Sequence, residues 1–214
     1  MTARMLCARC LRPQHNCICA LARPVDCAAE VLILQHPLEV HHAKGTARLL
    51  HLSLPHSRME VGEQFDAQQL HAWLRQGWHR DAALPRTLLL YPESPPDPTL
   101  PLLPAPPLPA EWLADPGRLR LVVIDGTWRK SRKMLYLHPL LQQLPRLALH
   151  ALPASRYAIR RAHRPGQLST LEATSCALAQ LQPGLNVAPL LAAMDALVQR
   201  EQQWRSAATA YSGS

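Results

Sequence analysis

The feature that most constrains the fold of this chain is a set of short apolar runs that are continuous rather than alternating. "VLILQH" (31–36), "RTLLLYP" (86–92) and "LRLVVID" (119–125) each have the length of a strand, and "RLALHALP" (146–153) is expected to be a fourth. A strand that is apolar on both faces must be covered on both faces, which is typical of a mostly parallel sheet. The sequence therefore predicts an α/β fold.

Helical segments are expected between and after these strands. One opens with Asp66 as a candidate N-cap, and another opens with Ser169 and Glu172 in the spacing of a capping box. The four expected helices are residues 44–54, 66–77, 169–181 and 188–204. The last is expected to pack through one face, formed by Leu190, Met194, Leu197 and Trp204.

The length of 214 residues suits one sizeable core with a small appendage. Residues 92–110 hold nine of the 21 prolines, so they can form neither a ladder nor a long helix. We interpret them as a surface loop rather than a linker between domains, because strands of the same character resume after them. The expected organisation is a cysteine-rich segment at 1–25 and an α/β domain at 26–214.

The chain shows no sign of export or of a membrane span. No apolar run approaches the ~20 residues of a transmembrane helix. The start, "MTARMLCARC", lacks the apolar segment of a signal peptide. We therefore expect a cytoplasmic protein in a reducing compartment, without a membrane association, and nothing in the sequence indicates a protein partner.

Four cysteines lie within thirteen residues near the start of the chain. Cys7, Cys10, Cys17 and Cys19 form a C-x2-C-x6-C-x-C array, in which each close pair can supply two ligands to one tetrahedral Zn²⁺. Ordinary thiols or a disulfide are the alternative, but in a reducing compartment they leave the clustering unexplained. Four thiolates would fill the coordination sphere, so the site is predicted to be structural. The other two cysteines, Cys27 and Cys176, are not needed for it.

Positive charge is concentrated in one part of the sequence. The net charge is +8 and the isoelectric point is near 9.6, which favours a polyanionic partner. From 126 to 171 there is no acidic residue, whereas nine of the 23 Lys and Arg lie there. A single carboxylate, Asp125, stands at the mouth of this stretch.

Common nucleotide-binding and hydrolase motifs do not fit. No glycine-rich turn follows the first apolar run, and neither G-x4-G-K-[ST] nor G-x-S-x-G occurs. His36, His41 and His42 have no acidic or histidine partner at ligand spacing. We interpret them as surface or phosphate-contacting residues.

Asp125 ends an apolar run at the position where parallel sheets bind ligands, beyond the carboxyl ends of the strands. Two interpretations are open on local grounds. Asp125 or Thr127 could simply cap the helix that follows, and the capping box accounts for Glu172 in the same way. Alternatively, phosphates held by the basic stretch would bring a nucleic acid to Asp125, and Trp128 would attract a cationic small molecule.

The residues "DGTW" (125–128) resemble the D-x-T-W signature of the DTW-domain family, the tRNA-uridine aminocarboxypropyltransferases. Further blocks in the same order are similar to the family pattern, so the resemblance spans most of residues 7–176. These blocks are the cysteine array with "LRPQHNCIC", "LQHPLEVHHAKGTARLL", "LLLYP" and "YAIRRAHRPGQLSTLEA". The proline-rich segment matches no motif of the family.

The resemblance implies a SPOUT-like fold with a C-terminal knot that binds S-adenosylmethionine. It implies transfer of the 3-amino-3-carboxypropyl group from this cofactor to N3 of a tRNA uridine, with release of methylthioadenosine. Asp125 is then the expected general base. The expected cofactor-binding residues are Thr127, Trp128, Tyr157, Arg160, Ser169, Thr170 and Glu172. Those expected to contact tRNA are Lys44, Arg48, Arg129, Lys130, Arg132 and Lys133.

Two other functions are compatible with the same residues. A SPOUT-type S-adenosylmethionine-dependent RNA methyltransferase would use the same cofactor and transfer a different carbon. A non-catalytic, zinc-containing RNA-binding module would use the cysteines and the basic stretch without binding the cofactor.

Overall fold

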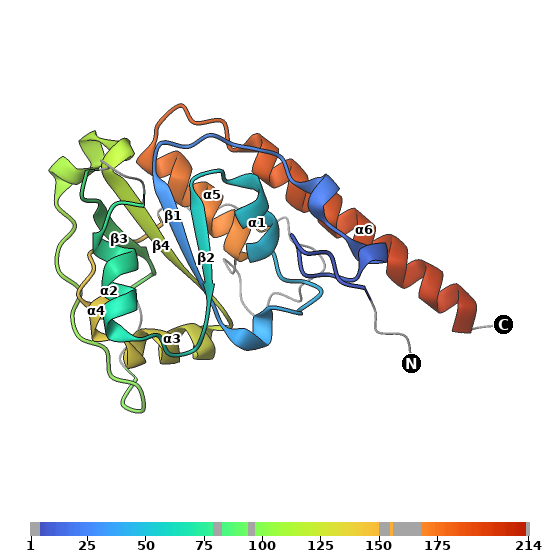
Figure 1. Cartoon of the computed structure of the whole chain (residues 1–214), viewed down its shortest axis with the longest axis horizontal. Coiled ribbons are helices and arrows are strands. Elements are labelled where there is room, and N and C mark those ends of the chain that lie inside the picture. Colours follow the sequence, from blue (N-terminus) through green and yellow to red (C-terminus); the bar gives the residue numbers. More distant parts are fainter. Residues whose placement is uncertain (1–4, 79–82, 94–96, 150–154, 156–167, 213–214) are drawn as a thin grey trace.

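The computed structural model describes residues 5–78, 83–93, 97–149, 155 and 168–212. It contains a five-stranded sheet whose strands all run parallel (Figure 1). The strands are β1 (Glu30–Gln35), β2 (Ser57–Val61), β3 (Arg86–Leu90), β4 (Leu119–Asp125) and β5 (Arg146–Leu147), in the spatial order β2-β1-β4-β3-β5. The predicted α/β fold with a parallel sheet is confirmed.

The strand predictions succeed in the centre of the sheet and fail at one edge. The runs at 31–36, 86–92 and 119–125 correspond to β1, β3 and β4 within two residues. Sequence analysis missed β2, an edge strand that is only half-buried and therefore carries Ser57, Arg58 and Glu60. The fourth predicted strand is present only as Arg146–Leu147, and residues 150–153 of it lie outside the described residues.

Six α-helices occur in the described part of the chain. They are α1 (Ala47–Ser53), α2 (Ala67–Arg75), α3 (Trp128–Leu137), α4 (Pro139–Gln142), α5 (Thr170–Leu181) and α6 (Ala188–Ser212). Short 3-10 helices span Gln14–Asn16, Cys19–Leu21, Pro37–Glu39, Ala110–Ala114 and Pro116–Arg118.

The predicted helix starts are confirmed at two positions. The Asp66 side chain accepts a hydrogen bond from the backbone N–H of Gln69 (2.9 Å), and Ser169 and Glu172 form the reciprocal capping box of α5. The predicted apolar face of α6 is correct for Leu190, Met194 and Leu197 but wrong for Trp204. Trp204 is 46% exposed because α6 extends past the edge of the core, where the Trp204 ring contacts His15. Figure 1 shows α6 projecting beyond the rest of the domain.

Helices cover both faces of the sheet, as the continuous apolar runs predict. Successive strand residues point to opposite faces, so Ile33 belongs to a core with α1, α5 and α6, whereas Leu34 belongs to a core with α2, α3 and α4. Both side chains are fully buried. Figure 1 shows the two groups of helices on opposite sides of the strands.

The chain leaves the two central strands in opposite directions. After β1 it passes through α1 to the outer strand β2, and after β4 it passes through α3 and α4 to β5 at the other edge. Such a point in an open parallel sheet forms a crevice at the carboxyl ends of the two strands. Gln35 and Asp125 are paired in register there.

The cysteine-rich segment packs against the main core. Ile18 of this segment is fully buried among residues of α1 and α6. Arg200 of α6 donates a hydrogen bond to the carbonyl oxygen of Cys17 (2.6 Å), and Arg12 forms an ion pair with Glu201 (3.1 Å). These contacts hold the segment on α6.

The proline-rich segment contains neither helix nor strand from 97 to 109 in the described part of the chain, as predicted. Leu102 packs against the core on one face of the sheet and Leu108 against the core on the other. Among the described residues, no helix combines the length and the apolar character needed to cross a membrane. The path between β5 and α5, on which the predicted knot depends, lies mostly outside the described residues, so the knot stays a prediction.

Candidate active site and metal centre

Asp125 lies at the crevice between β1 and β4 with its carboxylate fixed by two side chains. Its Oδ2 accepts a hydrogen bond from Nε2 of Gln35 (2.9 Å), and its Oδ1 accepts one from the hydroxyl of Thr170 (2.6 Å). Asp125 is only 6% exposed. Hydrogen bonds to a carboxylate stabilise its ionised form and fix its orientation, so β1, β4 and the start of α5 together aim this acid into the crevice.

A small polar pocket opens at the Asp125 carboxylate. It lies between the loop that precedes α1, the end of β4 and the start of α5. Its lining residues are Glu39, His42, Lys44, Gly45, Thr46, Asp125, Gly126 and Thr170. The Asp125 carboxylate thus faces a polar lining, in which Glu39 is ion-paired with Lys130 of α3 (2.8 Å).

Close contacts between backbone segments shape the pocket. The hydroxyl of Thr46, just before α1, accepts a hydrogen bond from the backbone N–H of Leu171 in the first turn of α5 (3.2 Å). A Cβ atom at Gly126 would lie 3.2 Å from Cβ of Lys130 and 3.7 Å from Cβ of His36. A side chain at Gly126 would thus crowd Lys130 and be in ordinary contact with His36, so glycine suits this lining position.

The structure assigns the cap of α3 to Thr127 and not to Asp125. The N-cap of α3 is Thr127, whose hydroxyl accepts from the backbone N–H of Lys130 (3.4 Å), so the helix does not need Asp125. Trp128 does not line the pocket. It is 49% exposed, and its ring meets Tyr91 edge-on with 6.0 Å between centroids. Asp125 and Trp128 are therefore close in sequence but contact different surroundings.

Ser169 and Glu172 are both buried and are occupied within the protein. Besides the capping box, both oxygens of Glu172 lie 3.0 Å from the hydroxyl of Ser155. The capping interpretation of Glu172 is confirmed, and a cofactor contact by Ser169 or Glu172 stays a prediction. Tyr157 and Arg160 lie outside the described residues.

His36 occupies a buried position that sequence analysis did not foresee. Its Nδ1 accepts from the backbone N–H of Leu38 (3.1 Å), so its Nε2 is the nitrogen left to donate to Glu63 (3.1 Å). The surface interpretation is wrong for His36. Sequence analysis also missed Gln35, the last residue of β1, and Glu63, which follows β2. Both residues lie at the carboxyl end of a strand, where parallel sheets bind ligands. The sequence alone does not tell which strands are neighbours, so it could not place these two residues near Asp125.

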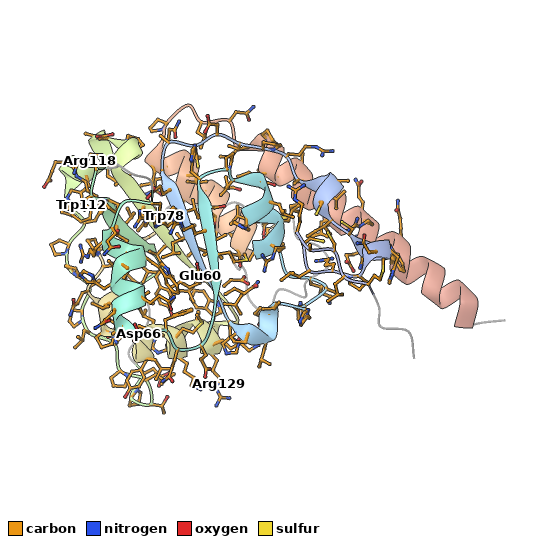
Figure 2. The ribbon with its side chains drawn as sticks, viewed as in Figure 1. Glu60, Asp66, Trp78, Trp112, Arg118 and Arg129 are labelled. Atoms are coloured by element: carbon orange, nitrogen blue, oxygen red, sulfur yellow. The ribbon has the colours of Figure 1, made fainter. Side chains whose placement is uncertain are left out.

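The basic stretch meets carboxylates from distant parts of the chain. The ion pairs are Lys130–Glu39 (2.8 Å), Arg132–Asp97 (3.5 Å) and Lys133–Glu63 (3.0 Å). The hydrogen bond from Lys133 holds the pKa of Glu63 below its usual value, and the bond from His36 adds to this. Arg129 is exposed and points outward near α3 (Figure 2). The positive field of α3 is thus weaker than the sequence suggests.

Lys44 and Arg48, the other predicted tRNA contacts, belong to the loop before α1 and to α1 itself. Lys44 lines the pocket, while Arg48 is half-buried in α1. Burial lowers the pKa of Arg48, an effect that the nearby Cys10 opposes. The role of the six predicted tRNA contacts stays a prediction.

The four clustered cysteines converge as a metal site requires. The Sγ atoms of Cys7 and Cys19 are 3.7 Å apart, as are those of Cys10 and Cys17, and all four lie within 4.8 Å of one another. A tetrahedral zinc with bonds of about 2.3 Å places thiolates about 3.8 Å apart. A disulfide would need sulfurs at about 2.05 Å, so the arrangement fits zinc and not the disulfide alternative.

The cysteine thiols also need a cation to ionise together. Backbone N–H groups of Cys10 and Arg9 lower the pKa of Cys7 to about 6, whereas burial and the neighbouring Cys17 raise the pKa of Cys19 to about 12. A divalent cation would remove this conflict by neutralising the thiolates.

The two remaining cysteines stay outside the cluster, as expected. Burial raises the pKa of Cys27 to about 11, and its thiol donates to the carbonyl oxygen of Ala29 (3.2 Å). Cys176 is half-buried in α5.

Comparison with known proteins agrees with this geometry. The model of the DTW domain matches residues 4–202. The chain belongs to the DTW-domain family. A Drosophila melanogaster protein named tRNA-uridine aminocarboxypropyltransferase 2 is 35% identical over 183 residues, which cover 84% of this chain and 67% of the relative. A Macaca fascicularis protein of the same name is 28% identical over 184 residues, which cover 82% of this chain and 56% of the relative.

A plant protein extends the similarity. The Arabidopsis thaliana protein named tRNA-uridine aminocarboxypropyltransferase A is 28% identical over 137 residues, which cover 62% of this chain and 50% of the relative. This DTW-domain chain thus spans between one half and two thirds of the length of these relatives. No solved structure matches it significantly.

Proposed function

We propose that this chain transfers the 3-amino-3-carboxypropyl group of S-adenosylmethionine to N3 of a tRNA uridine. The observation that carries the proposal is the position of Asp125. The acid of the D-x-T-W signature lies at the switch point of the sheet and opens into a polar pocket with Thr170. The names of the curated relatives support the same activity.

The residues of the pocket suit the charges of this cofactor. Asp125 supplies negative charge that suits a sulfonium, and Lys44 lines the same pocket. When bound, S-adenosylmethionine supplies an electrophilic carbon next to its sulfonium. Thr127, Trp128, Tyr157, Arg160, Ser169 and Glu172 remain proposed cofactor contacts through the family resemblance, and so does the knotted path between β5 and α5.

Asp125 is the proposed general base. The N3–H of uridine must lose its proton as the N3–C bond forms and the C–S bond breaks, with methylthioadenosine as the leaving group. The carboxylate of Asp125 takes this proton and later releases it to water. The hydrogen bonds from Gln35 and Thr170 hold this carboxylate at the crevice, where the proposed proton transfer takes place.

The other features complete the proposal. Zinc held by the four cysteines is structural, since four thiolates leave no open position for a substrate. The exposed side of α3, with Arg129, is the proposed start of the tRNA-binding surface. A cytoplasmic location fits both the substrate and the thiols.

The deciding experiment uses cofactor labelled separately on its methyl carbon and on its carboxyl carbon. The purified protein is incubated with unmodified tRNA, and the label in the RNA and the small co-product are measured. We expect only the carboxyl label in tRNA, together with methylthioadenosine. Entry of the methyl label with S-adenosylhomocysteine would instead establish the methyltransferase alternative. No binding of the cofactor would establish the non-catalytic one.

A further inference from the structure

Gln35 is a buried polar residue at the crevice, within the block "LQHPLEVHHAKGTARLL", and the sequence analysis gave it no role. It is the last residue of β1, lies opposite Asp125 in the β1–β4 register and is only 2% exposed. The preceding residues of the strand, from Val31 to Leu34, are all apolar and fully buried. An amide at the end of such a strand must lose its hydration, which costs free energy unless hydrogen bonds replace the water.

Only one end of the Gln35 amide is compensated. Its Nε2 donates to Oδ2 of Asp125, while its Oε1 is buried and has no hydrogen-bond partner in the described part of the chain. The reverse orientation would bring Oε1 against the carboxylate, so Asp125 fixes which end of the amide faces it. A buried acceptor without a partner costs about 1–3 kcal/mol.

The other buried side-chain atoms without a partner differ from this one. They are Oδ1 of Asn16 and the Nε atoms of Arg146 and Arg200. The described hydrogen bonds of the two arginine side chains go to carbonyl oxygens away from the pocket. For Gln35, by contrast, the one described side-chain bond goes to the acid of the D-x-T-W signature.

We propose that Gln35 is a positioning residue that acts through Asp125. This inference rests on the proposed function, since it assigns Gln35 a role in presenting the base. The two donors, Gln35 of β1 and Thr170 of α5, each bind a different oxygen of the carboxylate and so fix its orientation. The buried Oε1 of Gln35 costs free energy, and a role of Nε2 of the same amide in orienting Asp125 explains why a glutamine is present at this position.

The proposal separates turnover from stability. Gln35→Met keeps the approximate volume of the side chain and removes both the unsatisfied acceptor and the donor to Asp125. These two changes act on stability in opposite directions, since the first removes a buried acceptor without a partner and the second takes a hydrogen bond from a buried carboxylate. We therefore expect a melting temperature within a few degrees of the wild-type value, while kcat for aminocarboxypropyl transfer falls by about 10-fold or more. KM for S-adenosylmethionine should change by less than about 3-fold, because Gln35 does not line the pocket.

Gln142 provides the matched control. It is also a buried glutamine, but its Oε1 accepts from the backbone N–H of Leu103 (2.8 Å) and its Nε2 donates to the carbonyl oxygen of Tyr136 (3.1 Å). Gln142→Met should therefore lower the melting temperature and leave kcat nearly unchanged. Should Gln35→Met fail to fold, Gln35→Asn replaces it, since the shorter amide stays polar but cannot reach Asp125.

The outcomes separate this inference from the proposed function. Wild-type transfer combined with reduced kcat and retained stability in Gln35→Met supports the positioning role. Wild-type transfer with unchanged kcat in Gln35→Met overturns this inference alone. Equal losses of stability and kcat would show that Gln35 is merely structural and also overturn it. If the wild-type protein transfers no aminocarboxypropyl group, both proposals fall.

Discussion

The cysteine cluster and the Asp125 crevice are assembled in opposite ways. The four cysteines lie within thirteen residues, and their sulfurs converge within 4.8 Å to form a closed ligand set. The crevice combines Gln35, Thr46, Asp125 and Thr170 from four separate elements. It keeps a buried acceptor without a partner among the described residues, and its carboxylate faces a pocket. From this difference we propose that one region serves stability and the other serves chemistry.

The largest effect is expected at the cysteine cluster, the region that we propose to stabilise the fold. Freshly purified, reduced protein should contain about one zinc per chain. Because metal binding to such sites is folding free energy, Cys17→Ser should destabilise the protein by about 3 kcal/mol or more. The melting temperature would then fall by roughly 10 °C.

Cys176→Ser is the control for the zinc prediction. Cys176 is also only half-buried but lies outside the cluster, so its replacement should leave the metal content unchanged. Metal analysis and thermal unfolding provide the two measurements. Reduced protein without zinc would contradict the closed-site interpretation.

An intermediate effect is expected at Arg12, which connects the two regions. Arg12 lies between Cys10 and Cys17, and its guanidinium donates to the carbonyl oxygens of Ala43 (2.7 Å) and Gly45 (3.4 Å) in the loop that lines the pocket. Arg12→Lys keeps the charge but loses the fork of donors. The dissociation constant for S-adenosylmethionine should then rise by about 5- to 10-fold while zinc stays bound, as measured by calorimetry and metal analysis.

Arg23→Lys is the matched control for Arg12, because the guanidinium of Arg23 donates only locally, to the carbonyl oxygens of Ala20 and Ala22, in the described part of the chain. It should leave cofactor affinity unchanged. An equally unchanged affinity in Arg12→Lys would mean that the cysteine segment and the pocket are energetically independent.

The smallest effect is expected on the outer surface of α3. Arg129 and Arg118 are both exposed, and Figure 2 shows them at opposite ends of the domain. Arg129→Glu should weaken tRNA binding several-fold and lower the slope of log affinity against log salt by about 1, because one phosphate contact is lost. Arg118→Glu should change neither quantity. Equal effects of the two substitutions would remove α3 from the tRNA-binding surface.

The sequence predicted what depends on local pattern. Continuous apolar runs identified the three central strands because burial on both faces leaves no alternation to break the run. The edge strand β2 escaped because exposure admits Arg58 and Glu60. The cysteine site was predictable because spacing alone brings its ligands together, and the capping box of α5 was predictable for the same reason.

Pairing between distant segments was not predictable. Residues 126–171 contain no acidic residue, but the fold brings Glu39, Glu63 and Asp97 from other segments against α3. Asp125 was identified through its motif and its place at a strand end. Its partner Gln35 is 90 positions away and became visible only when the strand order placed β1 beside β4.

The central claim is that the Asp125 crevice is where the reaction occurs, and Asp125→Asn tests it most directly. The substitution keeps the shape of the side chain and removes the base. We expect transfer of the aminocarboxypropyl group to tRNA to slow by about 10²-fold or more. In the same preparation, zinc content should be unchanged and cofactor affinity should stay within about 3-fold of the wild-type value. Full transfer activity in Asp125→Asn would contradict the account and place the chemistry elsewhere.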